Sequence, residues 1–336
     1  SRRQLLLASA GAAALGTSAS GHAQLMDSGK VVKMVVGFPA GQATDMVTRV
    51  LAERLRAVTG ENYVVDNRPG QGGSLALGQL AKSPANGSVM MIAHMSAVAT
   101  NPHIYKSVPY DSGKDFEAVG LIGDLPFVLV CNPNLPVNNL KELIAYAKAN
   151  PDKLNNASSG NGTVSHLAME ELKRKAGLKI THIPYKGSVA GLTDVISGNV
   201  SMALETASAV RAHVESGRLR AIAAGSSKRL SGSLASVPTM IEQGFADFTA
   251  VTWLMMLYPA GTSKELVKTT HTALNSVMAQ PDMEQKLVSL GHAYPDPYTE
   301  EELQVLREKA KAENRPFLFR DHRPTESTTW DGESTL

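Results

Sequence analysis

The chain has 336 residues, of which 43% are hydrophobic and 19% are charged. This length accommodates two domains of ordinary size, and the composition is that of a soluble globular protein rather than a fibrous or disordered one. The formal net charge is +2, and without the arginine pair near the N-terminus 31 basic residues face 31 acidic ones. A basic surface of the kind that binds nucleic acid is therefore not expected. The single cysteine, Cys131, excludes an intramolecular disulfide.

The N-terminal segment has the pattern of a secretory signal peptide. Two arginines precede a short apolar run (residues 5–15), and Gly21 and Ala23 occupy the −3 and −1 positions of a cleavage site after residue 23. The run is too short for a spanning helix, which needs about 20 apolar residues. We therefore expect residues 1–23 to be cleaved and the protein to be exported to the periplasm. The arginine pair fits the twin-arginine route as well as the general Sec route, so both stay open.

Beyond this segment, strand-like apolar runs alternate with runs in which apolar residues recur at helical spacing. The first strand is predicted at 31–36 and the first helix at 46–58. The later predicted elements are, in chain order, strand 63–65, helix 75–81, strand 89–93, strand 127–131, helix 140–149, helix 164–176, helix 189–196, strand 202–204, helix 208–216 and strand 219–223. This alternation predicts an α/β fold with a mainly parallel sheet that helices cover on both faces.

Three polar turns that contain glycine each join a strand to a helix. Their sequences are GFPAGQATD (37–45), SSGNGT (158–163) and YKGS (185–188). Thr44, Thr163 and Ser188 are the predicted N-caps of the helices that follow. Such turns expose backbone amides at the positive end of a helix, where an anion binds. In open α/β sheets these turns lie at the carboxyl ends of the strands, where ligands bind.

No sequence pattern points to catalysis, a cofactor or a metal. The serine-hydrolase elbow, the P-loop and the H-E-x-x-H motif are absent, and the glycine run at 70–73 fails the dinucleotide fingerprint because Leu75 replaces its third glycine. Cys131 lies in an apolar strand and is expected to be a buried structural thiol. His166 and Glu170 share a helix face, but two side chains do not make a metal site. We predict no catalytic residue, no cofactor and no metal, and a hydrolytic enzyme is the alternative from another class.

Short motifs spread over most of the chain carry a resemblance to a known family. They are VGFPAG with TD (36–45), NRPG with GG (67–73), NP (101–102), PYD (109–111), KDF (114–116), SSGNGT with HL (158–167), HIPYKG (182–187), VPT (237–239), Trp253 and PAGT (259–262). In this order and spacing, from about residue 31 to residue 291, the chain resembles the Bug-type periplasmic solute-binding receptors of tripartite tricarboxylate transporters.

The resemblance implies two Rossmann-like α/β domains joined by two crossing segments, with a central ligand cleft, as in type II periplasmic binding proteins. The expected boundaries are 24–123 plus 250–313 for domain 1, 124–249 for domain 2 and 314–336 for an irregular tail. The resemblance further implies a non-catalytic monomer without cofactor, which captures a small carboxylate and delivers it to the membrane components of the transporter. A receptor that signals to a membrane partner is the alternative that the sequence leaves open.

The resemblance also implies the ligand-binding residues, because family members hold a carboxylate through loop amides and hydroxyls. The candidates from domain 1 are Phe38, Ala40, Gly41, Thr44, Asp45, Ser96 and Thr100. The candidates from domain 2 are Ser159, Gly160, Asn161, Thr163, Lys186 and Glu205. The two glycine-containing loops that supply most of them carry no lysine or arginine, so helix N-termini rather than an arginine clamp are expected to hold the ligand.

Two features depart from the family pattern. Gln42 stands where a second glycine is usual, so its side chain narrows the cleft or contributes an amide contact. At the other end, Pro316 interrupts the last helix, which is expected to begin near residue 300, and leaves 314–336 irregular.

A free carboxylate at Asp45 would repel an anion, and would favour a ligand with a donor group, such as a hydroxy- or amino-acid.

Overall fold

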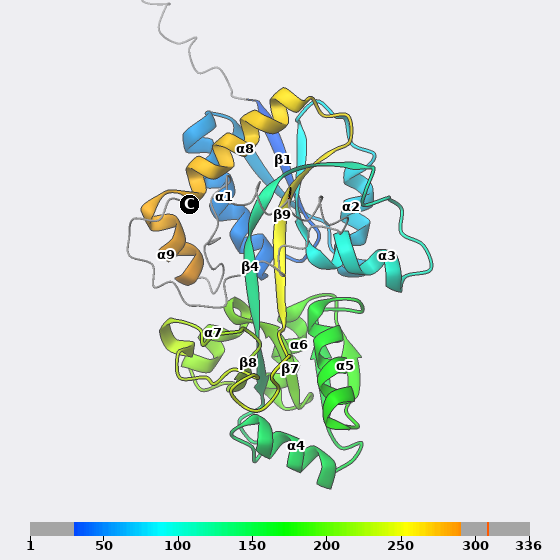
Figure 1. Cartoon of the computed structure of the whole chain (residues 1–336), viewed down its shortest axis with the longest axis vertical. Helices are drawn as coiled ribbons and strands as arrows, with labels where there is room; N and C mark the ends of the chain where they lie inside the picture. Colours follow the sequence, from blue (N-terminus) through cyan, green and yellow to red (C-terminus); the bar gives the residue numbers. More distant parts are fainter. Residues whose placement is uncertain (1–29, 290–307, 309–336) are drawn as a thin grey trace, which may run out of the picture.

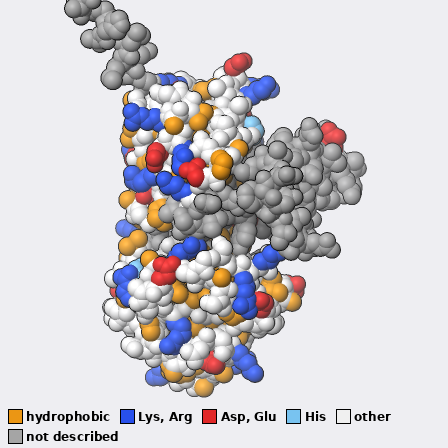
Figure 2. Space-filling model, turned by 90° about the vertical axis from the view of Figure 1, so that its left-hand side faces the viewer, with side chains coloured by type: hydrophobic (Ala, Val, Ile, Leu, Met, Phe, Trp, Pro, Cys, Tyr) orange, Lys and Arg blue, Asp and Glu red, His pale blue; other side chains and the backbone are white. Residues whose placement is uncertain are grey.

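Two α/β lobes lie one above the other in the computed structural model, which describes residues 30–289 and residue 308 (Figure 1). The predicted signal peptide, the irregular tail and, apart from residue 308, the helix after residue 300 lie outside the described residues. Among the described residues, no helix has the length and apolar character to cross a membrane. On the described part of the face in Figure 2, basic side chains are interspersed with acidic and neutral ones.

The first lobe is built on a mixed sheet. Its strands are, in spatial order, β2 (Asn62–Asn67), β1 (Val31–Val36), β3 (Val89–His94), β9 (Val251–Pro259) and the first part of β4 (Phe116–Cys131). β1 pairs in parallel with β2 and β3, whereas β9 runs antiparallel to β3 and β4. The helices of this lobe are α1 (Ala43–Thr59), α2 (Ser74–Leu80), α3 (Asn101–Ile104), α8 (Lys264–Met278) and α9 (Pro281–Ser289).

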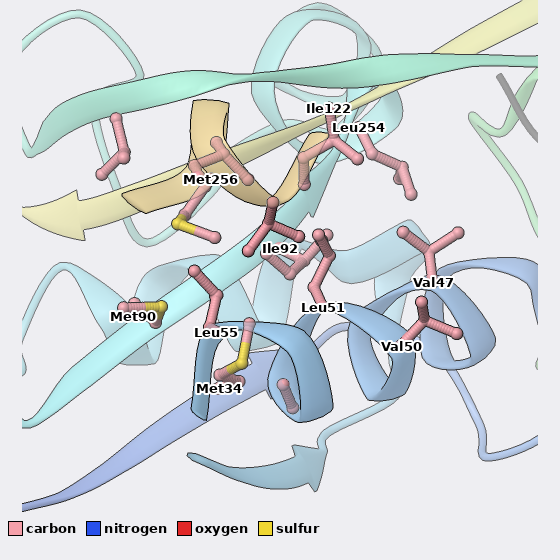
Figure 3. Packing of buried hydrophobic residues seen from close by; sticks show 14 of the residues in the cluster. Met34, Val47, Val50, Leu51, Leu55, Met90, Ile92, Ile122, Leu254 and Met256 are labelled. Carbon is pink, nitrogen blue, oxygen red and sulfur yellow. The ribbon is translucent and has the colours of Figure 1, made fainter. Parts of the chain in front are cut away.

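Apolar side chains fill both faces of this sheet, because successive residues of a strand point to opposite sides. Met34 of β1 belongs to the core under α1, α8 and α9, where Leu51 and Leu55 of α1 meet it at helical spacing (Figure 3). The next residue, Val35, belongs to the opposite core with Leu77 of α2. From Met34 to Val36, where consecutive residues are buried, the strand is thus apolar on both sides.

The second lobe has a similar layered arrangement. Its strands are, in spatial order, β8 (Arg220–Ala224), the last part of β4, β7 (Met202–Thr206), β5 (Asn155–Ser158) and β6 (Thr181–Pro184). Phe127 and Leu129 of β4 share a core with α4 (Leu140–Ala149) and α5 (Val164–Ala176). Val128 and Val130 share the other core with α6 (Ser188–Ser197) and α7 (Ala207–Glu215). Short helical turns at Gln71–Gly73, Ser96–Thr100 and Gly232–Leu234 complete the connections of both lobes.

The strand directions bring the carboxyl ends of both sheets to the junction between the lobes. β4 runs from the first lobe into the second and is antiparallel to β9, β7 and β8. β3 is antiparallel to β9, so β3 and its parallel neighbours β1 and β2 run toward the junction. β7 runs toward the junction from the other side, with β5 and β6 parallel to it. Consequently α1, α5, α6 and α7, which follow these strands, all begin at the junction.

Every strand and helix predicted within residues 30–289 is present, but the sheet is mixed rather than mainly parallel. The two crossing strands, β4 and β9, cause this difference because each runs against its neighbours. Most of β4 was not predicted, since Gly120, Gly123 and Pro126 interrupt its apolar pattern. β9 was not predicted either, and β5 and β6 were implied by the turns that follow them but were given no bounds.

The loop after β1 packs directly against the turn after β2. A Cβ atom on Gly37 would lie 2.6 Å from Cα of Gly73, which is backbone and cannot rotate away. We expect Gly37→Ala to lower the free energy of unfolding by about 1–3 kcal/mol, as overpacking usually does. In the control Gly113→Ala, the new Cβ would lie 3.5 Å from an aspartate oxygen, and a change within about 0.5 kcal/mol is expected. Urea unfolding measures both variants, and equal midpoints would contradict this packing.

Candidate functional site

A pocket lies at the junction, where the carboxyl ends of the strands and the starts of the helices meet. Its cavity volume is about 30 Å³. Residues at helix starts contribute one part of its wall: Gln42, Ala43 and Thr44 at α1, Thr163 and Ser165 at α5, Ser188 at α6 and Thr206 at α7. The remaining lining residues are Phe38, His94, Leu125, Phe127, Ser159 and Glu205. Both lobes therefore build the pocket.

Three of the four helices that begin at this pocket have no side-chain cap. Gln42, Gly187 and Thr206 precede the first turns of α1, α6 and α7, and none of them accepts a hydrogen bond from the helix backbone through a side chain. At α5, by contrast, the Thr163 hydroxyl accepts a hydrogen bond from the His166 amide at 3.4 Å. The first-turn amides of α1, α6 and α7 are therefore available to an anion in the pocket.

The rest of the wall is apolar or electrically neutral. Phe38, Leu125 and Phe127 line it, and the ring of Phe38 is tilted against the ring of His94 with centroids 5.0 Å apart. Burial lowers the pKa of His94 to about 3, so this imidazole is neutral. Its Nδ1 accepts a hydrogen bond from the Ser96 amide at 3.1 Å. Among the described lining residues there is no lysine or arginine, so helix starts supply the positive potential of the pocket.

Glu205, at the end of β7, is a buried carboxyl group in the pocket wall. Its Oε1 accepts hydrogen bonds from the hydroxyls of Ser159 at 2.6 Å and Ser165 at 2.9 Å. Burial raises the pKa of Glu205 to about 7, although these hydroxyls and the amides of Thr206 and Ser159 oppose the rise. Near neutral pH the group therefore carries only part of a negative charge, which limits its repulsion of an anion.

Asp45 is buried but does not line the pocket, because a network that shapes the loop after β1 engages its carboxylate. Arg49, one turn further along α1, binds both carboxylate oxygens at 2.9–3.0 Å. The Gly41 amide donates to Oδ2 at 2.8 Å, and Asn67 donates to Oδ1 at 2.9 Å. Burial raises the pKa of Asp45, but these hydrogen bonds outweigh it and the net shift is downward. The carboxylate is thus paired, contrary to the free carboxylate that the sequence analysis assumed.

A second hollow opens beside the pocket and shares Phe38 and Ser159 with it. Gly160, Asn161 and Lys186 line this hollow from the second lobe, and Lys186 is exposed to solvent there. The hollow therefore forms the outer part of the cleft, with the pocket as its inner part.

The thirteen candidate residues fall into three groups in the structure. Five line the inner pocket: Phe38, Thr44, Ser159, Thr163 and Glu205. Gly160, Asn161 and Lys186 line only the outer hollow. The others line neither space: Ala40 and Gly41 are exposed, Thr100 is half-buried, and Asp45 and Ser96 are buried outside the lining.

Comparison with known proteins places this geometry in a family. The family described as "Tripartite tricarboxylate transporter family receptor" matches residues 47–316. The chain belongs to this receptor family. It is 37% identical to Protein BugT of Bordetella pertussis, over 74% of this chain and 76% of that protein.

Solved structures agree with this membership. The receptor is similar to the periplasmic binding protein BugD, with 33% identity and a TM-score of 0.75 over 84% of this chain and 93% of that one. It is equally similar to R. palustris Rpa4515 with adipate, with 33% identity and a TM-score of 0.75 over 84% and 95% of the two chains. The resemblance inferred from the motifs and the α/β class are thereby confirmed. Because the family consists of solute-binding proteins, the prediction that the chain is not an enzyme is confirmed as well.

Part of the receptor's pocket was not predicted from the sequence. The lining residues not proposed as ligand contacts are Ala43, His94, Leu125, Phe127, Ser165, Ser188 and Thr206, whereas Gln42 was expected to narrow the cleft or contribute an amide contact. His94 and Thr206 each follow a predicted strand, so their place at a carboxyl end was a usable signal. Leu125 and Phe127 lie on the crossing strand and carried no such signal. The predicted N-cap at Thr163 is confirmed, whereas those at Thr44 and Ser188 are wrong because both residues lie inside the first turn.

The receptor also brings His182 beside His166 and Glu170, with candidate ligand atoms within 4.8 Å of one another. The two imidazole rings are stacked, with centroids 4.2 Å apart and planes 22° apart. A metal ion lies close to the plane of each ring that binds it, so stacked rings do not converge on one ion. Instead His182 Nε2 lies 2.6 Å from the Ser158 hydroxyl, and His166 Nδ1 accepts from the Gly162 amide at 3.3 Å. The pair supports the loop at 158–163.

The raised pKa of Glu205 predicts a pH-dependent stability of the ligand-free receptor. The folded state binds this proton more tightly than the unfolded chain, whose glutamates titrate near pH 4.5. The resulting stabilisation is full below about pH 4.5 and is lost as the pH rises through about 7. It amounts to on the order of 3 kcal/mol, from the difference between the two pKa values. We expect Glu205→Gln to remove this part of the pH dependence, measured by urea unfolding at about pH 5 and about pH 8. The same slope in wild type and variant would contradict the assignment.

Proposed function

We propose that this receptor captures a small carboxylate in the periplasm and delivers it to the membrane components of a tripartite tricarboxylate transporter. One observation carries the proposal: three uncapped helix starts, from both lobes, face a pocket whose described wall has no lysine or arginine. Such amides bind an anion without requiring a buried cation. The adipate in the similar Rpa4515 structure supports a carboxylate as the ligand class.

The available interactions are sufficient for a useful affinity. A helix N-terminus stabilises an anion by about 0.3–2 kcal/mol through its partial charge. Each hydrogen bond to a charged group adds roughly 1.5–3 kcal/mol. A few such bonds, less the cost of immobilising the ligand, reach about −8 kcal/mol, which corresponds to micromolar binding.

The cellular setting follows from the same proposal. The N-terminal arginines, apolar run and small residues before position 24 support export with cleavage of a signal peptide. We propose that the mature receptor acts as a monomer, since its pocket is built by two lobes of one chain. We also propose that the first lobe is domain 1, that the second lobe is domain 2 and that the crossing strands act as the hinge between them.

Calorimetry with a panel of mono- and dicarboxylates tests carboxylate capture. We expect Thr163→Ala to weaken binding by about 0.5–2 kcal/mol, because the hydroxyl caps α5 and also donates to the Gly160 carbonyl at 2.7 Å. Lys186→Ala is the matched control at the exposed outer hollow and should change affinity less. Loss of all binding in Lys186→Ala alone, or binding of uncharged ligands only, would contradict a site made of helix starts.

Contacts across the junction indicate how ligand draws the lobes together. The Gln42 amide of the first lobe donates to the Ser188 hydroxyl of the second at 2.8 Å. The Tyr105 hydroxyl of the first lobe donates to the Asn161 carbonyl of the second at 3.1 Å. Both bonds need the lobes close together, so they contribute to a closed state that ligand favours.

Removing the bond from Tyr105, which lines the outer hollow, should therefore weaken ligand binding without changing the inner pocket. We expect Tyr105→Phe to reduce affinity for a bound carboxylate by about 0.5–1.5 kcal/mol, the usual contribution of one hydrogen bond. In the control Tyr258→Phe, the lost bond to Thr270 lies within the first lobe, so stability changes but affinity does not. Calorimetry measures both variants, and small-angle scattering should show a smaller radius of gyration when wild type is saturated. An unchanged radius would count against closure.

A further inference from the structure

Gln42 places an unsatisfied hydrogen-bond acceptor at the pocket. The residue is only 5% exposed and lines the pocket at the start of α1. Its Nε2 donates to the Ser188 hydroxyl at 2.8 Å, but its Oε1 is buried and has no hydrogen-bond partner among the residues that the structure describes. A buried acceptor without a donor is destabilising, so the site is complete only when something donates to this oxygen.

A carboxylate alone cannot satisfy this atom, because an ionised carboxylate has acceptors only. The Glu205 carboxyl group adds further hydrogen-bond acceptors to the same wall, and its Oε1 already accepts hydrogen bonds from the hydroxyls of Ser159 and Ser165. The pocket therefore combines amide donors at the helix starts with acceptors close by. This arrangement complements a molecule that carries an anionic group and a donor side by side.

The position of Gln42 indicates where on the ligand the donor lies. Gln42 is the N-cap of α1, so the first-turn amides of Ala43 and Thr44 follow it directly. A carboxylate on those amides brings its neighbouring carbon toward the Gln42 side chain. An N-cap side chain has the reach to contact the amides of its own first turn, so it also has the reach to contact a donor on the carbon next to a carboxylate bound there.

We propose that the ligand is a hydroxy- or amino-carboxylate with its donor on the carbon next to the carboxylate, and that Oε1 of Gln42 accepts that hydrogen bond. The proposal rests on carboxylate capture, the function proposed above. It makes Gln42 the residue that distinguishes such acids from their unsubstituted counterparts. Asp45, the acid expected from the sequence to favour a donor group, is engaged by Arg49 and leaves this role to Gln42.

The test compares matched ligand pairs that differ only in the donor: malate with succinate, 2-hydroxyglutarate with glutarate, lactate with propionate, and aspartate with succinate. Calorimetry on wild type should show at least tenfold tighter binding of the substituted member in the best-binding pair. Gln42→Met keeps the side-chain size but has no amide, and should reduce this ratio below about threefold by weakening the substituted acid alone. Gln79→Met, on the exposed face of α2, is the control and should keep the wild-type ratio.

The outcomes separate this proposal from the function on which it rests. If wild type binds no carboxylate at all, carboxylate capture fails and this proposal fails with it. If carboxylates bind but substituted and unsubstituted acids bind equally, only the role of Gln42 fails. Preference for the unsubstituted acid would mean that Nε2 rather than Oε1 faces the ligand, which also overturns the proposal. The affinity ratio measured on wild type decides between these outcomes even if Gln42→Met does not fold. If Gln42→Met folds and keeps the wild-type ratio, the proposed role of Gln42 is contradicted as well.

Discussion

Strand β4 pairs with β9 in the first lobe and, in the second, with β7 from Phe127 onward and with β8 from Val128 onward. Because it runs antiparallel to strands of both sheets, the strands that precede α1, α5, α6 and α7 all end at the junction. Opposite directions in either lobe would bring helix C-termini there, with negative partial charges and free carbonyls. The anion-binding character of the pocket is therefore a consequence of strand direction, and depends less on any single side chain.

Such a site works only if nearby acids do not cancel the positive potential of the helix starts. Two buried acids lie close to the pocket, and the structure handles them differently. Asp45 stays ionised but is turned into the α1 loop, where Arg49 neutralises it and Gly41 and Asn67 complete its hydrogen bonds. Glu205 faces the pocket, but burial raises its pKa to about 7 and so reduces its charge. Asp45 thus shapes the loop and Glu205 forms part of the wall, and neither strongly repels a bound anion.

The sequence predicted the elements with a clear period, and the turns between them, because buried strands and amphipathic helices leave a local pattern. It did not predict the first part of β4, whose glycines and Pro126 are tolerated only because β9 pairs along it. Likewise, the motif identified Asp45 as close to the site, and Arg49 stood one helical turn away, but the direction of the carboxylate depends on Asn67 from another strand. A local sequence pattern does not record contacts with distant segments, so it could not predict which residues the crossing strand supplies to the site or how long-range contacts orient the side chains.

The Gln42 side chain takes part both in closure of the two lobes and in the proposed discrimination between ligands. The bond from Gln42 to Ser188 joins the two lobes, so in an open form both groups return to water and Oε1 is hydrated. Closing removes that water from Oε1, which costs roughly 1–3 kcal/mol unless a ligand donates to it. A ligand shifts the open–closed equilibrium only by its difference in affinity for the two forms. An unsubstituted acid would therefore be penalised at the closing step rather than at first contact with the helix starts, and a transporter that recognises the closed form would receive the selected ligand.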